Sequence, residues 1–366
     1  MKNVIILGST GNIGTQTVDV VGRLPDELKI VGLSAFANVS LLQEQAAILK
    51  LSATQLAYGP DCQLERLVRE TEADTVVVAV AGSVGVRATI AALETGKDVA
   101  LATKEVLVAA GEIITQTARR YGRQILPIDS EHSAIFQCIH RVPSREVARI
   151  CLTASGGPFR GFTIDQIQQV TLAQALHHPT WPNMGKKITV DSATMMNKGL
   201  ELIEATWLFN LEAKDVDISV HPQSIVHSFV QFVDGSVLAQ MGVADMRLPI
   251  QYALTYPNRV DSQLPRIDFQ SMQFNLEFEP PDPATFPALT LARIAAETGG
   301  TLPAVLNAGN EQSVELFLHG AIRFAQISEF VEHCMSDHSV IVHPDIEQIM
   351  RADSWARQKV KTLATV

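Results

Sequence analysis

Strand-like and helix-like segments alternate along the first 129 residues of the chain. Short apolar runs such as 3–8 (NVIILG) and 29–35 (KIVGLSA) have the length and residue types of buried strands. The segments between them, such as 12–24 and 40–49, place apolar residues at helical spacing. Strands separated by helices are typical of a parallel sheet covered on both faces. We therefore predict an α/β fold that begins with a doubly wound parallel sheet.

A glycine-rich loop follows the first strand. The stretch GSTGNIG places Gly8, Gly11 and Gly14 between that strand and the next helix, as in Rossmann-like domains. Glycine lets the backbone turn tightly and approach a pyrophosphate, and the start of a helix attracts an anion. A glycine turn without a ligand is the alternative, but the position of the motif favours a dinucleotide. The second strand ends in SAFANVS (34–40), which lacks the acid that binds the ribose 2′-hydroxyl of NAD, so NADP is favoured, although no Arg or Lys is present either.

Length and composition limit the remaining possibilities. A chain of 366 residues is long enough for two or three domains. The net charge of −10 argues against nucleic acid as a partner, and the longest apolar run, 76–81, is too short to span a membrane. We expect no signal peptide at the N-terminus and a cytoplasmic location. The cysteines show no CxxC pairing and are expected to be reduced, mostly buried thiols: Cys62, Cys138, Cys151 and Cys334.

The pattern changes after residue 129. We predict an NADPH-binding domain at 1–129 and a central α+β catalytic domain at 130–256, with a hairpin that turns at Asp234-Gly235. Prolines cluster in 257–287, which indicates a connecting arm, and 288–366 is expected to form a C-terminal helical domain.

Two carboxylates follow the last strand of the first region. Asp129 and Glu131 lie one residue apart in PIDSEHSA, with no Arg or Lys beside them in sequence. Like charges this close repel, so they need a cation. This pair is the first indication of a metal site.

A second polar segment, DSATMMNKGLELIEA (191–205), combines groups that suit a phosphate. We expect Ser192 to cap a helix that runs through Trp207, with Asn197, Lys198 and Glu201 on one side of it. A solvent-exposed Lys198–Glu201 ion pair is the alternative. If Glu201 instead joins Asp129 and Glu131, three carboxylates form a hard, oxygen-rich site suited to Mg²⁺ or Mn²⁺ rather than Zn²⁺.

Two loops are less informative. ASGGPF (154–159) offers the Ser155 hydroxyl and backbone amides to an anion, but alone it is more typical of an ordinary turn. HHPTWPNMG (177–185) contains Trp181 between two prolines. We interpret it either as a lid over a ligand or as a loop with a buried Trp181, with equal weight.

Together, GSTGNIG, KEVLVAAG, PIDSEHSAIFQ, LTASGGPF, HPTWPNMGKKITVDSATMMNKGLELIEA and HPQSIVHSFVQFVDGSVLAQMGVADMRLPIQYALTYPNR resemble the 1-deoxy-D-xylulose 5-phosphate reductoisomerase family along the whole chain. The resemblance implies NADPH- and metal-dependent conversion of 1-deoxy-D-xylulose 5-phosphate to 2-C-methyl-D-erythritol 4-phosphate, on the route to isoprenoids. It implies a retro-aldol and an aldol step followed by hydride transfer, and a homodimer.

Residue roles follow from the same resemblance. It implies that Asp129, Glu131 and Glu201 bind the metal, Mg²⁺ or Mn²⁺ with Co²⁺ as an alternative, and that Lys104, Glu131 and Glu201 are catalytic. Trp181 and Met184 would belong to a mobile flap at 177–187. The substrate-binding set is Lys104, Ser130, Glu131, Ser155, His178, Trp181, Ser192, Asn197, Lys198 and Glu201. The cofactor-binding set is Gly8, Thr10, Gly11, Asn12, Ile13, Ala37, Asn38, Thr103, Glu105 and Gly185.

The chain departs from the family pattern at four places. Thr103 replaces a usual Asn, Phe36 and Ala37 replace a Gly and a basic or small polar residue, Pro182 lengthens the flap, and Ala244 replaces a common Pro. Two rival functions remain: an NADP-linked dehydrogenase that needs no metal, and a non-catalytic NADP-binding sensor or scaffold. The first would retain activity in a chelator, and the second would not consume NADPH.

Overall fold

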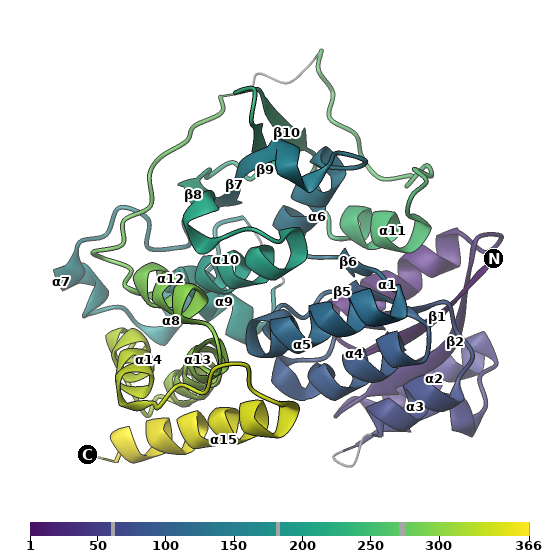
Figure 1. Ribbon diagram of the computed structural model, residues 1–366, viewed down its shortest axis with the longest axis horizontal. Coiled ribbons are helices and arrows are strands. Elements are labelled where there is room, and N and C mark those ends of the chain that lie inside the picture. The colour runs from purple at the N-terminus through teal and green to yellow at the C-terminus, as the bar shows by residue number, and fades with distance from the viewer. Residues whose placement is uncertain (60–62, 181–183, 271–274, 366) are drawn as a thin grey trace. The chain divides into compact units, whose positions relative to one another are not determined.

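The computed structural model describes residues 1–59, 63–180, 184–270 and 275–365 (Figure 1). The chain forms two compact units, each assembled from separate segments. Unit 1 comprises 1–106, 112–136 and 243–267, and unit 2 comprises 107–111, 137–242 and 268–366. None of the described helices is both long and apolar enough to cross a membrane. The predicted boundaries at 129, 256 and 287 stay a prediction.

Unit 1 is built on a six-stranded sheet with the order β3-β2-β1-β4-β5-β6, and every neighbouring pair is parallel. This confirms the predicted doubly wound sheet. The order reverses between β1 and β4, and such sheets bind dinucleotides at the carboxyl ends of the strands at that point. The strands are β1 (Lys2–Leu7), β2 (Leu28–Ala35), β3 (Leu56–Tyr58), β4 (Thr75–Val78), β5 (Asp98–Leu101) and β6 (Ile125–Pro127).

Helices cover this sheet because their apolar sides match its buried strands. Val4 and Ile6 of β1 are fully buried and share a core with Val20 and Val21 of α1. Ile250 of α11 joins the same core, so a helix from late in the chain lies beside α1 (Figure 1). The helices here are α1 (Asn12–Arg23), α2 (Val39–Leu49), α3 (Leu64–Glu70), α4 (Gly85–Glu94), α5 (Glu105–Tyr121), α6 (Ser130–Cys138) and α11 (Arg247–Thr255), of which α5 and α6 also contribute residues to unit 2.

Unit 2 contains a four-stranded mixed sheet with the order β10-β9-β7-β8. β7 (Val147–Ala154) pairs in parallel with β8 (Val216–Val220) and antiparallel with β9 (Val226–Phe232). β9 and β10 (Val237–Met241) form the predicted hairpin, in which Gly235 adopts the positive φ of 87° that its turn needs. The central α+β region is therefore confirmed.

The other regular elements described in unit 2 are mostly helices, as predicted for the C-terminal region. Val190, Val305, Phe324 and Phe330 belong to one buried cluster that joins the short helices to the C-terminal ones. The helices are α7 (Ile164–Ile167), α8 (Leu172–Ala175), α9 (Lys186–Ala193), α10 (Met196–Phe209), α12 (Ala288–Thr298), α13 (Leu302–Leu318), α14 (Ala325–Asp337) and α15 (Ile346–Leu363). Short 3₁₀ turns span Ser144–Glu146 and Ala213–Asp215 in unit 2, and Ala53–Gln55 and Gly82–Val84 in unit 1.

One local prediction was wrong. Ser192 does not cap a helix that runs through Trp207, because it lies in the last turn of α9, and a new helix starts at Met196. The Thr194 hydroxyl donates to the Asp191 carbonyl and accepts the Met196 amide, while Met195 takes a left-handed φ of 63°. A threonine that competes for backbone bonds in this way separates the two helices.

Candidate active site

The glycine-rich loop has the backbone that a dinucleotide-binding turn needs. Gly8 has a φ of 88°, and a Cβ there would lie 2.4 Å from the Ala79 carbonyl oxygen. A Cβ on Gly14 would lie 2.1 Å from the Gly8 carbonyl oxygen, so only glycine lets α1 pack this closely on the turn. Gly11 is less crowded and is the residue that precedes α1. Gly11 and Asn12 are both exposed, so the start of α1 is open to solvent. Thr10, Asn12 and Ile13 lie around the same turn.

The other predicted cofactor residues of unit 1 follow strands β2 and β5. Ala37 and Asn38 come after β2 and are exposed, and the Asn38 Oδ1 accepts the Leu41 amide at the start of α2 at 3.2 Å. Thr103 follows β5, and its hydroxyl donates to the Val80 carbonyl oxygen at 2.6 Å. That hydroxyl therefore ties the ends of β4 and β5 together. Glu105 begins α5.

Lys104 and Asp129 form an ion pair at the carboxyl edge of the same sheet. The Lys104 Nζ lies 2.5 Å from the Asp129 Oδ2, and both side chains are largely buried. They meet because β5 and β6 are adjacent parallel strands, so residues that follow them lie side by side. The sequence shows no cation next to Asp129, because Lys104 is 25 residues away. One ammonium thus offsets part of the charge of the acid pair.

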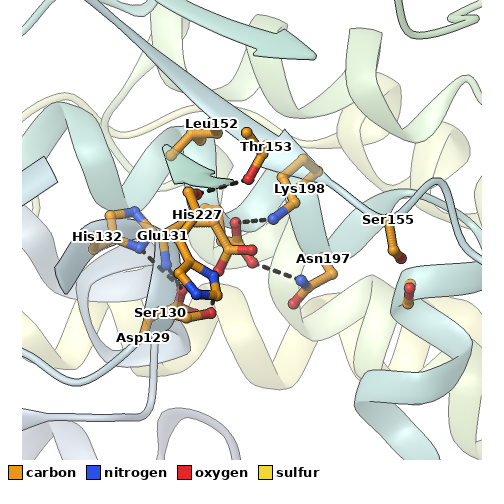
Figure 2. A network of polar contacts seen from close by, with 12 residues as sticks. Asp129, Ser130, Glu131, His132, Leu152, Thr153, Ser155, Asn197, Lys198 and His227 are labelled. Carbon is orange, nitrogen blue, oxygen red and sulfur yellow. Dashed lines mark hydrogen bonds and ion pairs between the residues drawn. The ribbon is translucent and has the colours of Figure 1, made fainter. Parts of the chain in front are cut away.

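α6 orients the second acid of the pair. The Glu131 amide donates to the Asp129 Oδ1 at 3.3 Å, and the Ser130 hydroxyl donates to the Glu131 Oε2 at 2.6 Å. His132, which is fully buried, lies with its Nδ1 3.4 Å from the Asp129 Oδ1 (Figure 2). This cluster of unit 1 is rich in oxygen ligands, which suits a hard divalent cation.

In unit 2, α10 holds a buried cluster around Glu201. Glu201 is 1% exposed, and its carboxylate accepts hydrogen bonds from the Asn197 amide and the Lys198 ammonium, both at 2.5 Å. These contacts appear as dashed lines in Figure 2. Lys198 is 5% exposed, so the alternative of a solvent-exposed ion pair is wrong. The spacing of three and four residues along the helix brings all three groups to one side.

A second cluster of unit 2 joins Ser155, His178 and Ser192. The His178 Nε2 lies 3.2 Å from the Ser155 Oγ and 3.0 Å from the Ser192 Oγ. Burial lowers the pKa of His178 to about 4, so the ring is neutral at pH 7. The Thr180 amide donates to its Nδ1, which leaves the proton on Nε2, facing the two hydroxyls.

The ASGGPF loop is more than an ordinary turn in this setting. Gly157 has a φ of 65°, and a Cβ there would lie 2.6 Å from the Ser192 carbonyl oxygen. Its amide donates to the Ser155 Oγ at 3.2 Å, so the glycine lets the loop approach α9 and fixes the serine. Gly185 is the first residue before α9, and Met184 is half-buried. Trp181 lies outside the described residues, so its role in a flap stays a prediction.

Comparisons with known proteins point to the same enzyme family in successive parts of the chain. A family model described as 1-deoxy-D-xylulose 5-phosphate reductoisomerase matches residues 4–58 and 48–111. Two models of C-terminal domains of the same enzyme match 125–209 and 241–359. A reductoisomerase of this name from Pelotomaculum thermopropionicum is 50% identical over 98% of this chain and 97% of its own length. The chain belongs to the 1-deoxy-D-xylulose 5-phosphate reductoisomerase family.

Further relatives and solved structures support this membership. The reductoisomerase of Desulfitobacterium hafniense strain DCB-2 is 48% identical over 99% of both chains. The structure of the Zymomonas mobilis reductoisomerase in complex with NADPH is 39% identical, covers 99% of both chains and has a TM-score of 0.91. A reductoisomerase structure with NADPH, fosmidomycin and magnesium is 37% identical, with the same coverage and TM-score.

Some polar residues beside the predicted site residues were not themselves predicted to belong to a site. His132 is one, and its position three residues after Asp129 at the start of a helix was an available signal. Asp191 is another: it is 1% exposed and binds the Lys187 ammonium and the Asn310 amide, each at 2.8 Å. Its place beside Ser192 was a signal, but Asn310 lies 119 residues away and could not be paired with it from the sequence.

Proposed function

We propose that this chain catalyses the NADPH- and divalent-metal-dependent conversion of 1-deoxy-D-xylulose 5-phosphate to 2-C-methyl-D-erythritol 4-phosphate, a step toward isoprenoid precursors. The reaction joins an isomerisation, by retro-aldol and aldol steps, to a reduction. The observation that carries the proposal is the 50% identity to a reductoisomerase over nearly the full length of both chains. The clusters described above supply the groups that such a reaction needs.

We assign the metal to Asp129, Glu131 and Glu201, which together offer only carboxylate oxygens. Mg²⁺ and Mn²⁺ prefer such ligands, and Co²⁺ is a further candidate. When bound, the metal supplies Lewis acidity to the ketone and the neighbouring hydroxyl of the substrate. The Lys104 ammonium, held by Asp129, stabilises developing negative charge on the substrate, and the Ser130 hydroxyl orients the substrate beside it.

The phosphate end of the substrate is assigned to unit 2. Ser155 and Ser192 offer hydroxyls, and neutral His178 offers the Nε2 proton that faces them. Lys198 adds a buried positive charge, and Asn197 adds an amide on the first turn of α10. Binding the phosphate anchors the substrate away from the reacting carbons, so that binding energy can align them. Trp181 and the flap would then exclude water.

We assign the reduced dinucleotide to the carboxyl edge of the sheet in unit 1. The turn built on Gly8, Gly11 and Gly14 approaches the pyrophosphate, and the start of α1 provides backbone amides. NADPH supplies the hydride. The remaining contacts are assigned to Thr10, Asn12, Ile13, Ala37, Asn38, Thr103, Glu105 and Gly185.

One assay separates this function from its rivals. NADPH absorbance is followed with 1-deoxy-D-xylulose 5-phosphate, with and without a chelator, and again after Mg²⁺ is restored. We expect consumption that stops in the chelator, returns with Mg²⁺ and yields 2-C-methyl-D-erythritol 4-phosphate. Consumption that persists in the chelator would indicate a metal-free dehydrogenase. NADPH binding without consumption under any of these conditions would indicate a sensor or scaffold.

We also propose that the chain forms a homodimer. β10 is an edge strand of its sheet, and its Val237 and Leu238 side chains are half exposed. An exposed apolar edge of this kind is suited to pairing with a second copy. Sedimentation should give a mass in solution of twice the chain mass. Leu238→Lys should lower that mass toward the monomer, whereas the control Lys214→Glu, on the exposed surface of unit 2, should not. A monomeric wild-type chain would refute this.

We further propose a cytoplasmic location. The thiols support a reduced state: Cys151 and Cys334 are free, and burial raises the pKa of Cys151 to about 12 and of Cys334 to about 11. Cell fractionation tests this proposal.

A further inference from the structure

The carboxyl end of β2 presents no charged side chain to a cofactor. In dinucleotide-binding sheets an acid at this place takes the ribose 2′-hydroxyl of NADH, and an arginine accommodates the 2′-phosphate of NADPH. Here Phe36 and Ala37 follow the strand, and both are exposed. The Asn38 oxygen is already bonded to the Leu41 amide as the cap of α2. No side chain between 34 and 40 therefore selects either cofactor by charge.

Two exposed aromatic rings stand at this edge instead. Phe36 is 71% exposed and Tyr58 is 52% exposed, although large apolar rings are usually buried. Ala35 of β2 pairs with Tyr58 of β3, so Phe36 and Tyr58 lie at the carboxyl ends of neighbouring strands. Aromatic rings in such a position can stack on a base, and stacking does not depend on the 2′ substituent of the ribose.

The glycine-rich loop lies beside the same end of β2. The amides of Gly8 and Ser9 donate to the Ser34 carbonyl oxygen at 3.1 Å and 2.8 Å. A dinucleotide with its pyrophosphate at this loop has its adenosine half across the end of β2. We therefore expect the adenine near these exposed rings and the ribose near Ala37.

We propose that this chain holds the adenosine half of its cofactor with Phe36 and Tyr58 and discriminates weakly at the ribose 2′ position, so that it binds NADH nearly as well as NADPH. This deepens the dinucleotide part of the proposed function. The start of α2 favours a nearby anion modestly, so we expect NADPH to bind about two- to fivefold more tightly than NADH.

The test is direct binding of the two cofactors without substrate or metal. Dissociation constants of NADPH and NADH are measured by titration calorimetry for the wild type and for Ala37→Arg. The added guanidinium can bind the 2′-phosphate, so the variant should bind NADPH at least about tenfold more tightly and leave NADH unchanged. A wild-type preference for NADPH above about 100-fold, or an unchanged preference in Ala37→Arg, would overturn the proposal.

The rings are tested separately. Phe36→Ala and Tyr58→Ala should each weaken NADPH and NADH equally, by about 5- to 100-fold. Phe36→Tyr should retain binding. Tyr121→Ala removes another exposed ring of unit 1, at the end of α5, and should change neither constant. If both ring variants bind as the wild type does, or lose NADPH alone, the proposal fails.

These measurements are independent of turnover. Binding of both cofactors with the expected ratio, but without reaction on 1-deoxy-D-xylulose 5-phosphate, would refute the proposed function and leave this inference standing. Turnover of 1-deoxy-D-xylulose 5-phosphate, together with a wild-type binding preference for NADPH above about 100-fold, would support the proposed function and refute this inference.

Discussion

The Lys198 ammonium donates to the Glu201 carboxylate at 2.5 Å, and both groups are almost completely removed from solvent. A buried ion pair is costly to assemble, and breaking it by removing one partner costs about 3–5 kcal/mol. Such a pair is weak evidence of a purely structural role. Its presence on one side of α10 beside Asn197 fits a site that meets an anion with the lysine and a cation with the glutamate.

Removing Lys198 should therefore affect both binding and stability. In Lys198→Met we expect the KM for the phosphosugar to rise about 10- to 100-fold, because a charge-assisted phosphate contact is lost. The melting temperature should fall, because Glu201 stays buried without its ammonium. Lys198→Met combined with Glu201→Gln should melt closer to the wild type. An unchanged KM would contradict the phosphate role, and a double variant that is less stable than Lys198→Met would contradict the pairing argument.

The glycines of the first turn should differ in their tolerance of a methyl group. Gly14→Ala places a Cβ 2.1 Å from the Gly8 carbonyl oxygen and should lower the melting temperature and abolish NADPH binding. Gly11→Ala meets its nearest atom at 3.4 Å, so it should fold normally but bind NADPH more weakly, because the backbone is kept from the pyrophosphate. Gly22→Ala, in open space on α1, is the control and should keep binding intact. Normal NADPH affinity in Gly11→Ala would contradict the assignment.

His178, buried against Ser155 and Ser192, should make stability depend on pH. Burial lowers the pKa of His178 to about 4 from an unfolded value near 6.5. Between these values the unfolded chain binds more protons than the folded chain. The contribution of neutral His178 to the free energy of unfolding is therefore full above about pH 6.5 and is lost as pH falls toward 4. Between pH 7 and pH 5, the melting temperature of the His178→Gln variant should fall by less than that of the wild type. Parallel losses in both proteins would contradict a neutral, buried His178.

The sequence predicted what depends on local pattern. The strands, the helices, the glycine-rich turn and the spacing of Asn197, Lys198 and Glu201 follow from periodicity and residue type. The break at Met195 was missed because it depends on one threonine hydroxyl competing for backbone bonds.

Contacts between distant segments could not be predicted in the same way. The Lys104–Asp129 pair requires the strand order of the sheet, and the Asp191–Asn310 bond requires the packing of α9 against the C-terminal helices. The burial of Lys198 is likewise a tertiary property, so its spacing alone favoured a surface ion pair.

The central claim is that Asp129, Glu131 and Glu201 hold one divalent cation. Titration of the protein with Mn²⁺, followed by electron paramagnetic resonance of the free ion, tests it without relying on turnover. We predict one site per chain in the wild type, retained in the exposed control Glu212→Gln. Each of Asp129→Asn, Glu131→Gln and Glu201→Gln should weaken that site at least about tenfold, with NADPH affinity unchanged. Wild-type Mn²⁺ affinity in Glu201→Gln would contradict the claim.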